Sequence, residues 1–231
     1  MAMYRLLSAA LFLSLAAGVA NAQSAVPPGQ GDPFKDTSML KPPPGVRVAI
    51  IEWEDLECPA CSHAFPVVHA AIAKYKIPLI RYDFQIPGHI WSHEASLYAR
   101  YLQDKVSPEL ATDYRRQVFA TQYQIASKDD LHAFTVKFFQ TNHQQLPFVL
   151  DPTGQFEKEV TADKALGEKL GLVHTPTLIV ATQKHWVQVV DTSSLYSVID
   201  TALAQTAGGA ATASAPVKKT APTTTAHKKT S

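Results

Sequence analysis

Residues 47–61 read RVAIIEWEDLECPAC and hold both cysteines of the 231-residue chain. The stretch opens with Arg47 to Ile51, a run rich in β-branched residues that is typical of a strand. It closes with Cys58-Pro59-Ala60-Cys61, in which the proline suits the first turn of a helix because its missing N–H is not needed there. The sequence therefore predicts that both cysteines lie at a strand-to-helix junction.

A Cys-x-x-Cys pair at such a junction carries out redox chemistry or binds metal. Its sulfurs are close enough to bond, and Cys58 lies at the helix N-terminus, where free N–H groups and the helix dipole stabilise a thiolate. A bridge between cysteines three positions apart closes too small a loop to restrain the unfolded chain appreciably. A purely structural disulfide is therefore disfavoured.

Residues 1–22 have the parts of a secretory signal. Arg5 supplies a positive start, Leu6 to Val19 is apolar, and Ala20-Asn21-Ala22 is a small-x-small cleavage site. We expect cleavage near Ala22 and export of the mature chain. The alternative, an uncleaved membrane anchor, would need a longer apolar run than this one.

Composition divides the remaining chain into three parts. Residues 23–45 are rich in Pro, Gly and Asp and predict an extended lead-in, residues 46–206 have the length of one domain, and residues 207–231 predict a disordered Ala/Thr/Lys tail. Of 21 basic and 20 acidic residues, Arg5 and four tail lysines lie outside the body, which leaves 16 basic residues and a net charge of −4. This balance argues against nucleic acid as a partner. The basic tail could in principle attach to an anionic envelope surface.

Hydrophobic periodicity predicts an α/β protein with a helical block in its middle. The first elements form a βαβ unit with parallel strands, and the last ones a hairpin followed by a helix. The predicted elements after the first strand are a helix at 59–74, a strand at 77–84, three helices that open near Ser92, Ser107-Pro108 and Ser127, a helix at 155–170, strands at 177–181 and 186–190, and a helix from Ser193 or Ser194.

These features resemble the DsbA-like disulfide oxidoreductases of the bacterial periplasm, a branch of the thioredoxin-like fold. The resemblance covers roughly Val46 to Gln205. It rests on Cys58-Pro59-Ala60-Cys61 after a strand, on Glu52 six residues earlier, on the helical block, and on residues 172–177, LVHTPT, which look like the family's cis-proline loop. It implies a thioredoxin-like fold, a βαβ … ββα mixed sheet, with an all-helical insertion at about 89–150, and a periplasmic protein.

The resemblance also implies roles for three residues. Cys58 would be the exposed nucleophile, and Cys61, one turn further and more buried, would resolve the mixed disulfide. Glu52 would be a buried acid that helps to move the proton of Cys61, because burial raises the pKa of a carboxyl towards neutral. The alternative is that the strand turns Glu52 to solvent.

Substrate binding is implied for the loop before the second strand pair. Pro176, if cis, would lie against the disulfide, and its missing N–H would leave the neighbouring backbone free to pair with an extended substrate peptide. Thr175, Pro59 and Ala60 would flank the sulfurs. A trans Thr-Pro turn is the alternative.

The redox direction stays open. Ala60 stands where the most oxidising members of the family carry histidine, and the acids at positions 54, 55 and 57 are expected to place negative charge near Cys58, which disfavours its thiolate. A threonine at position 175 also looks more like the isomerase and reductase branch, whereas Pro59 is shared with oxidising members. We therefore predict a weaker oxidant than the most oxidising members.

The partners implied are cysteine-containing exported proteins and an unidentified redox partner protein, and no cofactor is predicted. Residues 23–44 are too short for the dimerisation domain of related isomerases, so a monomer is expected. Two other functions stay open: a copper- or zinc-binding module built on Cys58, Cys61 and His63, to which His89 and His93 could contribute, and a non-catalytic peptide-binding protein.

Overall fold

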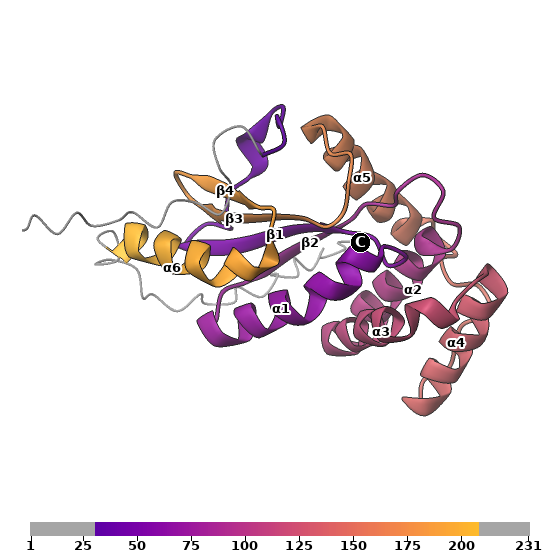
Figure 1. Cartoon of the computed structure of the whole chain (residues 1–231). Helices are drawn as coiled ribbons and strands as arrows, with labels where there is room; N and C mark the ends of the chain where they lie inside the picture. The colour runs from indigo at the N-terminus through magenta and orange to yellow at the C-terminus, as the bar shows by residue number, and fades with distance from the viewer. Residues whose placement is uncertain (1–30, 208–231) are drawn as a thin grey trace, which may run out of the picture.

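In the computed structural model, which describes residues 31–207, the apolar runs of the sequence form one four-stranded mixed sheet (Figure 1). The strands lie in the order β2-β1-β3-β4. The β1–β2 pair is parallel and the other two pairs are antiparallel. The predicted signal peptide and all but the first residue of the predicted tail lie outside the described residues. The strands are β1 (Val48–Glu54), β2 (Leu79–Asp83), β3 (Thr177–Thr182) and β4 (Trp186–Val189).

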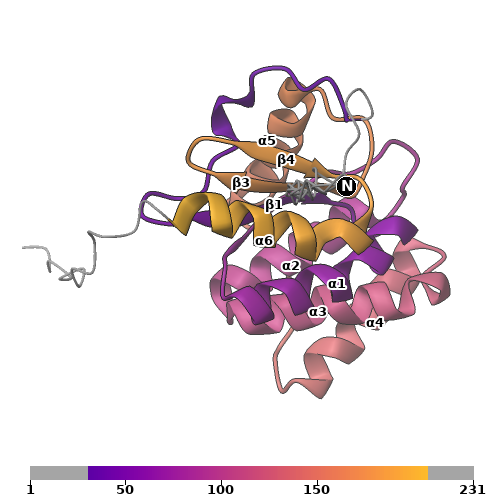
Figure 2. The same cartoon turned by 60° about the vertical axis from the view of Figure 1, so that its left-hand side comes forward.

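Helices cover both faces of the sheet (Figure 1, Figure 2). On one face, α1 (Pro59–Tyr75) and α6 (Leu195–Thr206) pack on aliphatic residues that include Val48 and Ile50. On the other face, Ile51 and Trp53 pack with Leu170 of α5 (Gln155–Leu170) and with Leu40 of the segment before β1. Because side chains alternate along a strand, Glu52 and Glu54 share the face of Val48 and Ile50, under α1.

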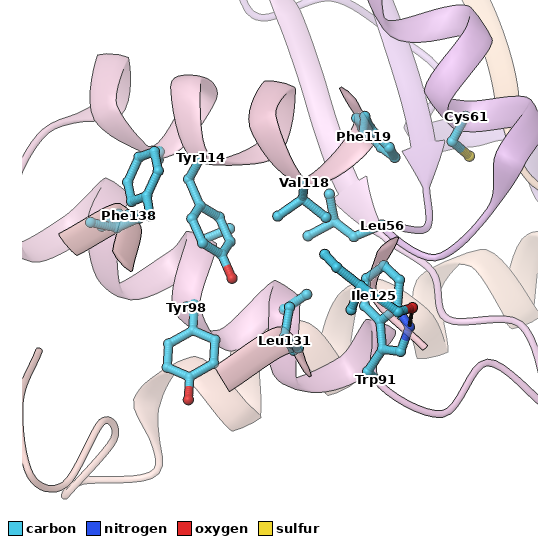
Figure 3. Close-up of a cluster of buried hydrophobic side chains, with 14 of the residues drawn as sticks. Leu56, Cys61, Trp91, Tyr98, Tyr114, Val118, Phe119, Ile125, Leu131 and Phe138 are labelled. Atoms are coloured by element: carbon cyan, nitrogen blue, oxygen red, sulfur yellow. Dashed lines mark hydrogen bonds between the residues drawn. The ribbon is translucent and has the colours of Figure 1, made fainter. Parts of the chain in front are cut away.

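The helical insertion consists of α2 (Ser92–Lys105), α3 (Pro108–Thr121) and α4 (Lys128–Thr141) and packs beside α1 (Figure 2). Ser107 and Ser127 cap the second and third of these helices by accepting the N–H of Leu110 at 3.0 Å and of Asp130 at 3.1 Å. The insertion has its own core, which Figure 3 shows to be rich in aromatic rings.

The predicted fold class is confirmed, including the parallel βαβ unit, the hairpin and the insertion. The main difference is at the end of β1, which continues beyond the apolar run through Glu52, Trp53 and Glu54. All seven residues of the strand are buried, so two acidic side chains lie inside the protein. None of the helices within residues 31–207 is long and apolar enough to cross a bilayer.

Candidate active site

Cys58 and Cys61 lie at the start of α1, as the sequence predicts. Cys58 is the N-cap residue in an extended conformation, and Cys61 follows in the first turn; both are free thiols. Cys61 is 0% exposed and Cys58 is 8% exposed. The expected order of burial is confirmed, but the expectation of an exposed Cys58 is wrong, because the loop that carries Thr175 covers it.

The two thiols have opposite acidities. The pKa of Cys58 is lowered to about 5, chiefly by a hydrogen bond with the Cys61 thiol; burial opposes the shift, while Thr175 and the N–H groups of Cys61 and Ala60 add to it. The pKa of Cys61 is raised above its ordinary value by burial first, and then by the hydrogen bond and charge of Cys58. At neutral pH, Cys58 is therefore the thiolate and Cys61 the thiol.

The Thr175–Pro176 peptide bond is cis, as predicted for this loop. Sγ of Cys58 lies 3.3 Å from the carbonyl oxygen of Thr175, across 117 positions of sequence, and donates to it when the thiol is protonated. Pro59 and Ala60, between the cysteines, are exposed. The loop, both cysteines and the two residues between them thus come together at one end of the sheet.

Glu52 lies buried in β1, opposite Arg81 of β2 and Leu178 of β3, so the solvent-facing alternative is wrong. Its Oε2 atom has no hydrogen-bond partner among the described residues. Burial, followed by the negative charge of Glu54, raises its pKa to about 8, while Arg81 and Arg115 act in the opposite sense. Glu52 therefore carries a proton at neutral pH.

Glu54 is held by two arginines rather than aimed at the cysteines. Its Oε1 atom accepts from Nη1 of Arg115 at 2.7 Å and lies 3.1 Å from Nε of Arg81. Arg115 also donates to Asp83 at 2.8 Å, so one buried guanidinium of α3 joins the ends of β1 and β2.

Asp55 and Glu57 hold the chain segment that leads into the insertion. Asp55 accepts from the N–H of Ile86 at 2.7 Å and is 2.6 Å from Nδ1 of His89. Glu57 accepts from the N–H groups of Trp91 at 2.7 Å and Ser92 at 3.0 Å, at the start of α2.

The expectation that these three acids act on Cys58 is therefore wrong. None of them is among the main causes of the lowered pKa of Cys58, whereas Glu54 raises the pKa values of Glu52 and Cys61. The physical reason is that each carboxylate has nearby cationic or N–H partners that the local sequence does not reveal.

Sequence reasoning also missed the buried arginines. Arg100 of α2 donates to Asp83 at 2.7 Å and pairs with Asp163 of α5, next to the Arg115 contacts. A signal was present, because Arg115 falls on the apolar stripe of its helix, between Ala111 and Val118 at helical spacing. A charge at such a position indicates a buried partner.

A pocket of about 350 Å³ lies between the start of α1 and the insertion. Trp91 forms part of its wall. Its Nε1 atom donates to the carbonyl of Ile125 at 3.0 Å (Figure 3). The lining residues are Glu57, Pro59, Ser62, His63, Trp91, Phe119, Gln122, Tyr123 and Ile125.

The histidines considered as metal ligands point to other partners. His89 contacts Asp55, and Nε2 of His93 lies 2.8 Å from Glu157 of α5, while His63 lines the pocket. Within residues 31–207, no three His, Cys, Asp or Glu side chains gather in a way that could hold a metal ion.

A strand that leads into a Cys-x-x-Cys helix and a cis-proline loop against the first sulfur define the thioredoxin-like class of fold, which here carries a helical insertion. The family model described as Thioredoxin matches residues 44–201, and the chain belongs to this family. No curated protein matches the chain in sequence.

Solved structures give the same fold. The chain is similar to α-DsbA1 of Wolbachia pipientis, with 16% identity, a TM-score of 0.58, and coverage of 75% of this chain and 98% of that one. BdbD of Bacillus subtilis in its oxidised form has 18% identity and a TM-score of 0.57 over 71% and 91% of the two chains. A periplasmic thioredoxin-like protein of Salmonella enterica serovar Typhimurium has 17% identity and a TM-score of 0.54 over 70% and 87%. At these identities the likeness concerns the fold, and the predicted DsbA-like fold is confirmed.

Proposed function

We propose that the chain is an exported thiol–disulfide oxidoreductase that exchanges disulfides with cysteine-containing proteins through Cys58 and Cys61. The observation that carries the proposal is the difference between the two thiols, because a low pKa at Cys58 and a raised pKa at Cys61 give one nucleophile or leaving group and one resolving thiol. The cis-proline loop in contact with Cys58 supports the same reading.

In the oxidising direction, a substrate thiolate attacks Sγ of Cys58 in the Cys58–Cys61 disulfide. The S–S bond breaks, its electron pair goes to Cys61, and a mixed disulfide forms between Cys58 and the substrate. A second substrate thiolate then attacks the substrate sulfur and releases Cys58 as a thiolate. The substrate leaves with a disulfide, and the enzyme leaves as a dithiol that a redox partner must reoxidise.

The other site residues take supporting roles in this proposal. Pro176 and Thr175 present an edge of backbone beside Cys58 on which an extended substrate peptide can lie, and Pro59 and Ala60 form the exposed surface between the sulfurs. Glu52 exchanges a proton with Cys61, since its raised pKa suits a proton donor near neutral pH.

We infer the expected reduction potential from the acidity of Cys58. Its pKa of about 5 lies between the values of about 7 in thioredoxin and about 3.5 in DsbA. We therefore expect a reduction potential between about −270 mV and about −120 mV, the values of those two proteins. The prediction of a weaker oxidant stands on Ala60 and Thr175 and no longer on the three acids.

Export and oligomeric state belong to the same proposal. The signal-like residues 1–22 and the periplasmic Salmonella neighbour support a periplasmic protein that begins near Gln23, which N-terminal sequencing of the mature chain would establish. A monomer is proposed, and light scattering on diluted samples would contradict it if a dimer persists.

Trapping of mixed disulfides tests the activity. We expect the wild-type chain to catalyse insulin reduction and Cys58→Ala to be inactive. Cys61→Ala keeps the nucleophile and loses the resolving thiol. It should therefore accumulate mixed disulfides with cysteine-containing proteins, and reducing agents should cleave these disulfides. An inactive wild type, or equal trapping by the two variants, would contradict the proposal and favour a binding protein.

A further inference from the structure

Two buried acids of β1 differ in their partners. Glu52 and Glu54 are both 1% exposed and, two positions apart in a strand, lie on the same face of the sheet. Glu54 is paired with Arg115 and Arg81, whereas Glu52 makes no hydrogen bond through its buried Oε2 atom. When two neighbouring carboxyls compete in this way, the one with cationic partners ionises and the other keeps its proton.

The charges that act on the pKa of Glu52 come from three elements: Glu54 from β1 itself, Arg81 from β2 and Arg115 from α3. Asp83 of β2 bonds to Arg115, and His69 of α1 lies 2.9 Å from Arg81. Leu178 of β3 and the buried residues of α6 are apolar. His69 adds no charge, because burial and then the adjacent Arg81 lower its pKa to about 4.

The buried cluster is electrically balanced only when Glu52 is neutral. It holds three guanidinium groups, from Arg81, Arg100 and Arg115. Three carboxylates pair with them, from Glu54, Asp83 and Asp163. A fourth ionised acid at Glu52 would leave an unpaired negative charge in the interior, which is costly.

We propose that Glu54 is a positioning residue that keeps Glu52 protonated at neutral pH, and that Arg115 of the insertion holds Glu54 in place for this purpose. The inference rests on the proposed function, since it assigns the state of the group that serves Cys61. The insertion then contributes to the chemistry through its arginine as well as covering the cysteines.

The step that uses this proton is the opening of the Cys58–Cys61 disulfide. The attacking thiolate forms a bond to Cys58, the electron pair of the broken S–S bond goes to Cys61, and the proton of Glu52 passes to the Cys61 sulfur. Glu52 is left as a carboxylate and recovers a proton from solvent. The step is therefore fast while Glu52 is protonated and slows as Glu52 loses its proton.

The test follows the reduction of the oxidised protein by excess glutathione over a range of pH. The observed rate is divided by the fraction of glutathione present as thiolate, so that the remaining pH dependence belongs to the protein. For the wild type we expect this rate to fall near pH 8, where Glu52 titrates. In Glu52→Gln the fall should be absent.

Two charge-removing variants have opposite expected effects. In Glu54→Gln the negative charge that raises the pKa of Glu52 is removed while Arg81 and Arg115 remain, so the inflection should move down by about one pH unit or more. In Arg81→Gln a positive charge is removed, and the inflection should move up. A merely structural role for Glu54 would not give shifts of opposite sign.

Asp83→Asn is the matched control. It also removes an Arg115 partner, but Asp83 is not among the charges that act on the pKa of Glu52. We expect lower stability and a smaller shift of the inflection than in Glu54→Gln. Titration of the Glu52 carboxyl carbon by NMR in the glutamate-labelled dithiol protein, assigned with Glu52→Gln, gives the same comparison without any activity.

The outcomes separate this inference from the proposed function. A wild-type disulfide that glutathione cannot reduce would contradict the proposed function, while the NMR titration still decides the role of Glu54. A wild-type inflection that neither Glu54→Gln nor Arg81→Gln moves would overturn the inference. An equal shift in Asp83→Asn and Glu54→Gln would also overturn it, and if Glu54→Gln does not fold, Arg81→Gln decides alone.

Discussion

The sheet and the helical insertion are stabilised by different kinds of core. The buried hydrophobic cluster between the sheet and helices α1 and α6 is built from aliphatic side chains, such as Ile50, Val180 and Ile199. The core of the insertion is rich in aromatic rings, and Tyr114 and Phe138 meet edge to face with centroids 5.1 Å apart. Cys58 and Cys61 belong to the second core, although they sit on a helix that covers the sheet.

The boundary between these two regions is where the charged residues are buried. Arg115 and Arg100 reach from the insertion to acids at the ends of β1 and β2, next to the apolar contacts around the cysteines. The insertion therefore both covers the active site and supplies charged partners to the sheet. Its arginines pair with Glu54 and Asp83, the acids at the ends of the two parallel strands.

Removal of Arg115 should have the largest effect on the charged contacts between the insertion and the sheet. We expect Arg115→Met to lower the free energy of unfolding by about 3–5 kcal/mol, because the buried carboxylates of Glu54 and Asp83 lose their shared partner. Urea denaturation measures the loss. Arg116→Met is the matched control, since the Arg116 side chain is 58% exposed and a surface pair contributes about 1 kcal/mol or less. Equal losses in the two variants would contradict a special role for the boundary.

The second largest effect should be a change in the pH dependence of stability in Glu52→Gln. The pKa of Glu52 rises from 4.5 to about 8 on folding, so the folded state binds the extra proton between these values. Wild-type stability is therefore lost as pH rises through this window, and Glu52→Gln should remove that loss.

We expect Glu52→Gln to become more stable relative to wild type by about 4 kcal/mol between about pH 5 and about pH 9. Urea denaturation at several pH values measures this difference. Glu168→Gln, at an exposed position of α5, is the control and should follow the wild type. A difference between Glu52→Gln and wild type that does not vary with pH would contradict the raised pKa.

A substitution that disturbs the close packing on the other face of the sheet should lower the stability less. A Cβ atom at Gly167 of α5 would lie 2.5 Å from Cδ2 of Phe84. Overpacking costs about 1–3 kcal/mol, while alanine gains about 1 kcal/mol of helix propensity, so Gly167→Ala should lose about 1 kcal/mol net. Thermal unfolding measures it, and a stabilised variant would show that α5 shifts freely.

The exposed contact between the insertion and α5 should matter least. His93 and Glu157 are 2.8 Å apart but both side chains are about half exposed. We expect His93→Ala to change the free energy of unfolding by less than about 0.5 kcal/mol, since solvent screens such pairs. A loss comparable to that of Arg115→Met would mean that the buried cluster is not what joins the two regions.

Local signals in the sequence predicted the fold well. Capping serines at 107 and 127 marked two helix starts, and Gly171 marked the end of α5. The Cys-x-x-Cys pair was placed correctly by its local pattern, whereas the burial of Glu52 and the cis Thr175–Pro176 bond were expected from the resemblance to the DsbA-like family.

Long-range pairing explains what the sequence could not reveal. Glu54 meets Arg115 across 61 positions, and Cys58 meets Thr175 across 117. The first contact gives Glu54 a cationic partner, and the second covers the sulfur of Cys58. The two expectations that failed, an exposed Cys58 and acids that act on it, therefore both concerned partners distant in the chain. Neither composition nor periodicity indicates which buried charge will find which partner.

The most direct test of the account is the titration of the two thiols in the reduced protein. Ultraviolet absorbance of the thiolate, recorded between about pH 3 and about pH 10, reports each deprotonation. The account predicts a first step near pH 5 that is absent in Cys58→Ala, with no deprotonation of Cys61 until well above its ordinary value. A first step near the ordinary thiol value of about 8.5, or one that survives in Cys58→Ala, would contradict it.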